Sequence, residues 1–207
     1  MSSERIVHIV DDEAGVRKAT GLLLEMSGFA TRQYESGEAF LAAASEAASG
    51  VVLLDIRMPG MDGLQVQQAM NERQLGLPVI VLTGHGDIAT AVKAIRAGAL
   101  EFLEKPYDEQ DLLASVEAAF EKLQEGKVRD LVDDEPDIGP IATLSRRERM
   151  VLVGLMEGKQ NKNIAYDLGL SPRTVEMYRA RMMDKLAARS LSDALRLGLE
   201  ARRQGQL

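Results

Sequence analysis

The first 126 residues alternate between two hydrophobic periods, and this alternation limits the fold more than any other feature of the sequence. Short apolar, β-branched runs at 6–10, 51–54 and 79–82 have almost no polar interruption. Such runs are typical of strands buried on both faces of a parallel sheet. Weaker strands are predicted at 30–34 and 101–103.

Between these strands, apolar residues recur at the three- to four-residue spacing of an amphipathic helix. Five such helical patterns follow the five strands, and Gly28 and Gly98 mark the ends of the first and fourth. We therefore expect an α/β fold: a doubly wound, five-stranded parallel sheet with helices on both faces.

The remainder of the chain differs in charge. The net charge is -7, but residues 1–126 carry 10 Lys and Arg against 20 Asp and Glu, whereas residues 141–207 carry 13 against 7. Residues 126–140 are rich in acidic residues, Pro and Gly, which predicts a linker, with the fifth helix running on to about Leu131. We expect domains at 1–125 and 141–207, unless the charge difference is only a drift in composition.

Composition excludes several classes of site. The 207 residues contain no Cys and only two His, which excludes disulfides and thiolate metal sites and argues against a Ser-His-Asp triad. The first residues do not form a signal peptide, and the longest apolar runs are far shorter than the ~20 residues of a membrane span. A cytoplasmic protein with no membrane partner is expected.

No strand is predicted after Pro140; instead the sequence predicts four short helices, an all-α module. Ser145 and Glu148 have the spacing of a capping box. The helices are expected to begin at four N-caps: Ser145, Asn161, Ser171 and either Ser190 or Ser192. The turn at 168–172, with Gly169 before a Ser-Pro start, suits a helix-turn-helix.

Polar side chains stand at the carboxyl ends of the predicted strands, which is where doubly wound folds bind ligands. They are Asp11 and Asp12 after the first strand, Asp55, Thr83 and Lys105. Carboxylates 4–5 Å apart repel by roughly 3–4 kcal/mol per pair, so three of them need a cation or raised pKa values. Oxygen ligands favour Mg²⁺. Asp55 is a candidate nucleophile toward a phosphoryl group. The alternative is that Asp11 and Asp12 only cap the first helix.

These segments resemble the receiver domain of two-component response regulators. The resemblance rests on four motifs: Val10-Asp11-Asp12-Glu13, Leu54-Asp55-Ile56-Arg57-Met58-Pro59-Gly60, Thr83-Gly84-His85-Gly86-Asp87 and Lys105-Pro106. It implies a flavodoxin-like fold and phosphorylation of Asp55 by a sensor histidine kinase.

The resemblance also implies roles for the neighbouring residues. Mg²⁺ is held by Asp12, Asp55, the Arg57 carbonyl and Asp11, and Thr83 and Lys105 contact the phosphoryl oxygens. Phe102 stands in the place of the aromatic switch residue, and Lys105-Pro106 is expected to be cis. His85 is expected to be a surface or switch-loop residue and not a catalytic base. The chain is then no enzyme beyond Mg²⁺-dependent phosphorylation and dephosphorylation of itself.

Residues 141–198 resemble the LuxR/NarL-type DNA-binding domain, and the whole chain resembles the FixJ/NarL family. The motifs are Leu144-Ser145-Arg146-Arg147-Glu148, Asn161-Lys162-Asn163-Ile164-Ala165 and Leu170-Ser171-Pro172-Arg173-Thr174-Val175-Glu176. On the helix from Pro172 to Leu186, Val175, Met182 and Leu186 form the core face. The candidate contacts to double-stranded DNA are Lys162, Arg173, Thr174, Glu176, Met177, Arg179, Ala180, Arg181, Lys185 and, as a phosphate contact, Arg189. The alternative is a solvated charged face.

The last helix has more leucines than one internal face needs. Leu191 and Leu195 are dimerisation candidates, or they complete the core of the module. If the chain forms a homodimer when phosphorylated, its DNA site should be pseudo-palindromic. RNA polymerase is a further expected partner. Two other functions fit the sequence less well. An aspartate-dependent phosphatase needs a second Asp as general acid at the position of Arg57. An RNA-binding module needs aromatic side chains that stack on bases, and only 4% of the residues are aromatic.

Overall fold

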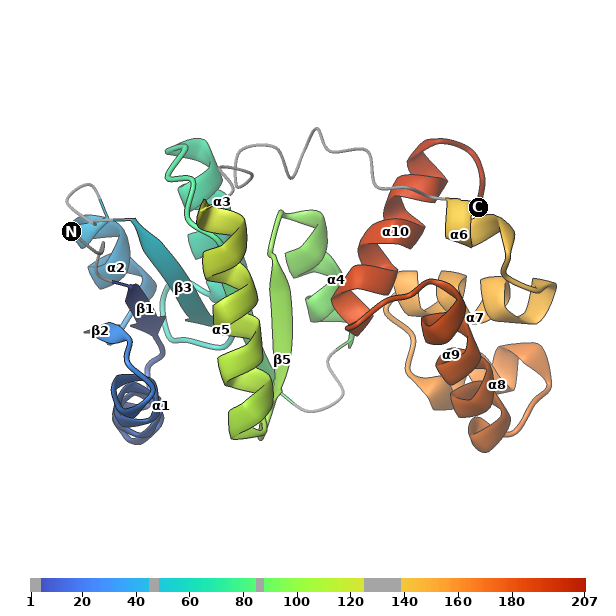
Figure 1. The fold of residues 1–207 in the computed structure, drawn as a ribbon, viewed down its shortest axis with the longest axis horizontal. Helices are drawn as coiled ribbons and strands as arrows, with labels where there is room; N and C mark the ends of the chain where they lie inside the picture. Colours follow the sequence, from blue (N-terminus) through green and yellow to red (C-terminus); the bar gives the residue numbers. More distant parts are fainter. Residues whose placement is uncertain (1–4, 45–48, 85–87, 125–138) are drawn as a thin grey trace. The chain divides into compact units, whose positions relative to one another are not determined.

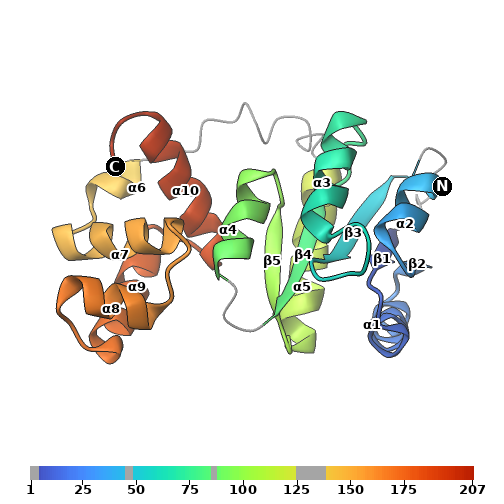
Figure 2. The same ribbon diagram turned by 180° about the vertical axis from the view of Figure 1, so that it is seen from behind.

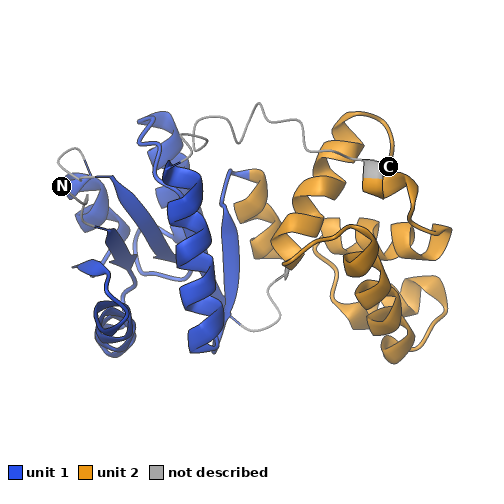
Figure 3. Cartoon of the chain, in the orientation of Figure 1, with its two compact units in different colours: residues 1–85, 97–132 blue, residues 86–96, 133–207 orange. Residues whose placement is uncertain are grey.

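The computed structural model describes residues 5–44, 49–84, 88–124 and 139–207. Two compact units make up the chain: residues 1–85 with 97–132, and residues 86–96 with 133–207 (Figure 3). The predicted extension of the fifth helix beyond residue 124 and most of the predicted linker lie outside the described residues, and so does His85.

The first unit is built on the predicted five-stranded parallel sheet, and its strand order is β2-β1-β3-β4-β5 (Figure 1). The strands are β1 (Ile6–Val10), β2 (Ala30–Tyr34), β3 (Gly50–Asp55), β4 (Val79–Gly84) and β5 (Glu101–Lys105). β1 and β3 are buried along their whole length, because helices cover both faces of the sheet. The strand order reverses between β1 and β3, so their carboxyl ends form the crevice typical of ligand sites in this fold class.

Helices cover the two faces of the sheet. They are α1 (Ala14–Met26), α2 (Gly37–Ala43), α3 (Gly63–Glu72) and α5 (Glu109–Gln124). One face carries alternate strand residues such as Val7 and Leu53, which pack against Leu24 of α1 and Val116 of α5. Helix α3 lies on the side of the sheet opposite α5 (Figures 1 and 2).

The second unit is helical. It contains α4 (Ile88–Arg96), α6 (Gly139–Ala142), α7 (Arg146–Met156), α8 (Asn161–Leu168), α9 (Pro172–Lys185) and α10 (Leu191–Arg203). The unit holds α4 because α4 contacts α10. The four predicted helices are α7 to α10; α6 was not predicted and begins within the segment expected to be linker.

Helix starts in this unit follow the capping chemistry of the sequence, with one exception. Ser145 and Ser190 each form a complete capping box, and the Ser171 hydroxyl accepts the amide of Thr174. The predicted cap at Asn161 is wrong: the N-cap is Gln160, its side chain makes no capping bond, and Asn161 is the first helical residue. No helix among the described residues is long and apolar enough to cross a membrane.

Candidate functional site

Three carboxylates meet at the carboxyl end of the sheet. Asp11 directly follows β1, Asp12 is the next residue, and Asp55 is the last residue of β3. One carboxylate oxygen of each lies within 4.8 Å of the others. Asp11 and Asp55 are buried, whereas Asp12 is exposed. The cluster is therefore open to solvent on the side of Asp12.

The first helix does not use these carboxylates as caps. Its N-cap is Glu13, which makes no side-chain capping bond. Asp11 Oδ1 instead accepts the Glu13 amide at 2.8 Å, and the Asp11 carbonyl accepts Arg17 Nη1 at 2.6 Å. The capping alternative does not account for Asp11 and Asp12, and the contact from Arg17 was not visible in the sequence.

Lys105, at the end of β5, supplies the positive charge of the cluster. Its Nζ lies 2.7 Å from Asp11 Oδ2 and 3.1 Å from Asp55 Oδ1. Burial is the largest influence on the pKa of Asp55 and raises it; the charge and hydrogen bond of Lys105 lower it, Asp11 and Asp12 raise it, and on balance the pKa is raised. Burial acts to lower the pKa of Lys105, but its hydrogen bond to Asp11 and the charge of Asp55 raise it on balance. Lys105 is thus a fixed cation.

Thr83, in β4, completes the predicted group. Its hydroxyl is buried and has no hydrogen-bond partner among the described residues. A buried hydroxyl without a partner is destabilising, so the site is suited to a ligand that accepts a hydrogen bond from it. Phe102, the expected switch residue, is half-buried in β5 and pairs in register with Val81. The Lys105-Pro106 peptide is cis, as expected.

Glycines hold the backbone around Asp55. A β-carbon at Gly63 would meet the Asp55 carbonyl oxygen and lie 2.9 Å from the Ile56 Cα. A β-carbon at Gly84 would overlap the guanidinium of Arg57, whose side chain is exposed. The sequence placed only the Arg57 carbonyl in the site; the packing of its guanidinium on β4 depends on contacts between distant segments.

In the second unit, α8 and α9 are joined by a turn in which Gly169 has φ +64°, as a helix-turn-helix requires. The predicted core residues Val175, Met182 and Leu186 are confirmed as buried. The exposed DNA candidates are Lys162, Arg173, Glu176, Met177, Ala180, Arg181, Lys185 and Arg189.

Three of the candidates, including the exposed Lys185, have internal partners. Lys185 Nζ binds the buried carboxylate of Glu148 at 2.7 Å, because α7 packs on α9. The Thr174 hydroxyl lies 2.8 Å from Ser171 Oγ, so it takes part in the cap of α9. Arg179 is half-buried and already has an interaction within the chain. These residues are less available to a nucleic acid than their position on α9 suggested.

The two leucines expected at a dimer contact differ in exposure. Leu195 is completely buried, and Leu191 is half-buried. In this structure Leu195 therefore belongs to the core of the unit, the alternative that the sequence left open, and offers no surface to a second copy.

Two family models match the chain. Residues 7–117 match the response regulator receiver domain, and residues 142–197 match the bacterial regulatory proteins of the luxR family. The chain is a response regulator with a LuxR-type DNA-binding domain. Both matches lie inside the domains predicted from the sequence, whose outer boundaries stay a prediction.

Similar proteins support this response-regulator assignment. The transcriptional regulatory protein FixJ of Rhizobium meliloti is 45% identical over 194 residues, covering 93% of this chain and 94% of FixJ. FixJ of Bradyrhizobium diazoefficiens is 39% identical over 202 residues, or 97% and 98% of the two chains. The crystal structure of full-length FixJ from B. japonicum has a TM-score of 0.58 at 38% identity, covering 98% and 99%.

This response regulator thus combines a receiver domain with a DNA-binding domain. It is a transcription regulator of a two-component system and not a classical enzyme. The receiver accounts for the cluster around Asp55, and the luxR-type domain accounts for the helix-turn-helix and its basic charge.

Proposed function

We propose that Asp55 accepts a phosphoryl group from the phosphohistidine of a sensor histidine kinase. One Asp55 oxygen attacks the phosphorus, the bond from phosphorus to the imidazole nitrogen breaks, and the leaving nitrogen takes a proton from solvent. The observation that carries the proposal is the arrangement of three groups: the buried Asp55 carboxylate, the Lys105 ammonium 3.1 Å from it, and the Thr83 hydroxyl, which has no partner among the described residues.

Lys105 and Thr83 have separable roles. Lys105 lowers the pKa of Asp55 by its charge and its hydrogen bond, against the larger upward effect of burial, and it provides a fixed positive charge for a phosphoryl oxygen. The Thr83 hydroxyl donates to another phosphoryl oxygen and thereby gains the partner that it lacks. A proton is not needed from either residue during transfer.

The carboxylate set fits Mg²⁺. Both oxygens of Asp11 are already bonded, to Lys105 and to the Glu13 amide, whereas Asp12 is exposed. We therefore assign direct coordination to Asp12, Asp55 and the Arg57 carbonyl, with Asp11 acting through water. When bound, Mg²⁺ offsets the negative charge of the carboxylates and the phosphoryl group.

Phosphorylation adds about -1.5 to -2 charge next to Lys105 and Thr83. Movement of Thr83 toward the phosphoryl group leaves space into which Phe102 moves, which changes the surface near β5. The changed surface favours a homodimer, so that two DNA-binding domains engage one site with higher affinity.

We further propose that α9 enters the major groove of double-stranded DNA. Arg173 and Arg181 contact phosphates, while Glu176 accepts from cytosine and Met177 or Ala180 contacts a thymine methyl group. Lys162 and Arg189 add phosphate contacts. RNA polymerase is the partner through which binding regulates transcription, and the whole pathway lies in the cytoplasm.

The test compares Asp55→Asn with Asp62→Asn, a variant that keeps a good N-cap on α3. Acetyl phosphate and Mg²⁺ should add one phosphoryl group to the wild type and to Asp62→Asn, and none to Asp55→Asn, by intact-protein mass. Labelling of Asp55→Asn at the wild-type level would contradict the proposal.

The DNA step is tested by selecting bound duplexes from random DNA, with and without phosphorylation. We expect a pseudo-palindromic motif enriched by the phosphorylated wild type and not by Asp55→Asn. Full affinity of Asp55→Asn for the same motif in acetyl phosphate would rule out phosphorylation as the switch.

A further inference from the structure

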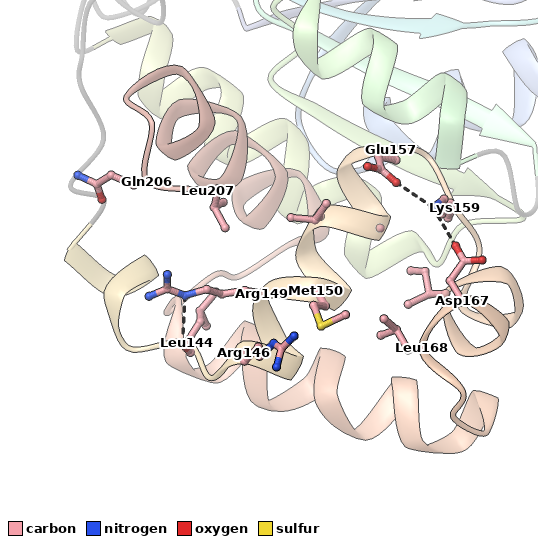
Figure 4. A pocket seen from close by; sticks show the side chains of 13 residues that line it. Leu144, Arg146, Arg149, Met150, Glu157, Lys159, Asp167, Leu168, Gln206 and Leu207 are labelled. Atoms are coloured by element: carbon pink, nitrogen blue, oxygen red, sulfur yellow. Dashed lines mark hydrogen bonds and ion pairs between the residues drawn. The ribbon is translucent and has the colours of Figure 1, made fainter.

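A cavity of about 610 Å³ opens in the second unit between α7, α8 and the last two residues (Figure 4). This volume falls within the ~300–1,000 Å³ of small-molecule sites. No residue of α9 lines the cavity, and no residue of the carboxylate site does. Neither phosphorylation of Asp55 nor recognition of DNA by α9 therefore explains why this cavity is present.

The middle of the cavity is apolar. Its side chains are Leu144, Met150, Val153, Ile164, Leu168 and Leu207. Met150 and Leu168 remain partly exposed at its wall, although both are large apolar residues. Covering such a surface with an apolar ligand is favourable by about 25 cal/mol per Å² buried.

Charges stand at the two ends of this apolar surface (Figure 4). At one end Lys159 is paired with Glu157 at 2.9 Å and with Asp167 at 2.8 Å, so its charge is already neutralised. At the other end Arg146 is exposed, and its guanidinium forms no ion pair with a carboxylate in the part of the chain that is described.

Arg149, beside Arg146, adds a second positive charge at that end. Its guanidinium donates only to backbone carbonyls, those of Leu144 and Ala142, both at 3.3 Å. Neither arginine is therefore neutralised by an acidic side chain among the described residues. The cavity joins a cationic end to an apolar body, which is complementary to an anionic amphiphile.

We propose that this cavity binds a small, free amphiphilic carboxylate, with its head group on Arg146 and its apolar body along Met150 and Leu168. Because α7 and α8 both line the cavity, an occupant would contact the first helix of the helix-turn-helix without covering α9.

The probe is decanoate below its micellar concentration, titrated calorimetrically into the full chain, with decan-1-ol as the uncharged counterpart. Arg146→Ala should weaken decanoate binding by roughly fivefold, the range of an exposed ion pair, and leave decanol binding unchanged. The matched control is Arg202→Ala, an exposed arginine of α10 in the same unit that does not line the cavity, which should bind both probes as the wild type does.

Val153→Trp fills the cavity from α7 and should abolish binding of both probes. Its circular dichroism spectrum and its binding to duplex DNA in a gel-shift assay should match those of the wild type. Such a match would show that the loss of ligand binding is not caused by unfolding. If Val153→Trp unfolds, the Arg146→Ala comparison between the two probes decides alone.

The proposal is overturned if decanoate does not bind, if a folded Val153→Trp binds it normally, or if Arg146→Ala weakens decanol as much as decanoate. Binding to phosphatidylglycerol vesicles without binding to free decanoate would also overturn it, because the ligand would then be a membrane surface. Saturable binding of one decanoate with the expected Arg146 dependence supports it.

Discussion

The carboxylate site and the helix-turn-helix are built in opposite ways. Asp11, Asp55, Thr83 and Lys105 come from four strands and meet only because the sheet aligns the strand ends. The helix-turn-helix is one continuous segment of the chain, in which α8 ends at the left-handed Gly169 and α9 begins at the Ser171 cap. The first depends on contacts between distant residues and the second on local signals, so substitutions should act through different physical causes in the two regions.

The largest expected effect is at Lys105, where one side chain holds the distant carboxylates together. Lys105→Met leaves Asp11 buried and beside two other carboxylates without a cation. We expect a loss of about 3 kcal/mol in the free energy of unfolding of the first unit without Mg²⁺, the scale for breaking a buried ion pair. Hydrogen exchange of peptides from β1 and β3 measures this loss, and Mg²⁺ should partly restore stability.

The control for Lys105 is Lys18→Met, on the exposed side of α1, which should change stability by less than about 0.5 kcal/mol. Equal losses in the two variants would show that the ion pairs of Lys105 contribute nothing specific to the site.

A smaller effect is expected at Gly63, where the site depends on backbone contact. The β-carbon of Gly63→Ala would press on the Asp55 carbonyl and the Ile56 Cα, so the backbone that carries Asp55 must move. We expect a loss of about 2 kcal/mol and phosphorylation by acetyl phosphate slowed at least about tenfold. Urea denaturation and the rate of mass increase measure the two effects.

Gly15→Ala is the matched control, because a β-carbon there meets nothing within 4 Å and the residue is helical. It should raise stability by about 0.5 kcal/mol and leave the rate unchanged. A normal phosphorylation rate in Gly63→Ala would show that the Asp55 backbone tolerates the shift.

This comparison also explains how far the sequence predicted the fold. The apolar runs of β1 and β3 were unambiguous because both faces of these strands are buried. The half-buried β5 gave a weaker signal, and it extends two residues further, to Lys105. Helix α6 was missed, since its Gly-Pro start is equally typical of a linker.

The candidate site was predictable where position along a strand decides it. Asp55 and Lys105 end their strands and Thr83 is the last residue but one of β4, so parallel topology places them together. The contact between Arg57 and Gly84 and the pairing of Lys185 with Glu148 were not predictable, because both depend on how elements pack. Residue type alone had made Lys185 a DNA contact.

Next to the helix-turn-helix, Glu148 of α7 pairs with Lys185 of α9, and its substitution tests whether local capping is reinforced by a distant charge. Burial acts to raise its pKa most strongly, but the Lys185 hydrogen bond and the Ser145 amide together hold that pKa below 4.5. Glu148→Gln keeps the cap and loses the ion pair, so we expect a loss of about 1.5 kcal/mol at pH 7.

The sign of the pH dependence follows from the lowered pKa of Glu148. Its contribution is present above pH 4.5 and is lost as the pH falls through the folded-state pKa, so the wild type and Glu148→Gln should converge in acid. Hydrogen exchange of α7 peptides from pH 7 downward follows this convergence. The control is Glu157→Gln, which removes an exposed ion pair and should lower the free energy of unfolding by less than about 0.5 kcal/mol. If Glu148→Gln destabilised the protein as much in acid as at pH 7, the ion pair with Lys185 could not be the cause.

The smallest effect is expected at Gly169, where only local conformation is at stake. Its φ of +64° is left-handed, while a β-carbon there would meet nothing within 4 Å. Gly169→Ala should therefore cost about 1 kcal/mol through backbone strain alone, and Gly169→Asn less, because Asn tolerates this conformation better. Hydrogen exchange of the Leu170 amide, which donates to Ala165 at 2.8 Å, measures both. Equal losses for Ala and Asn would mean that the turn depends on packing, and the second region would then resemble the first.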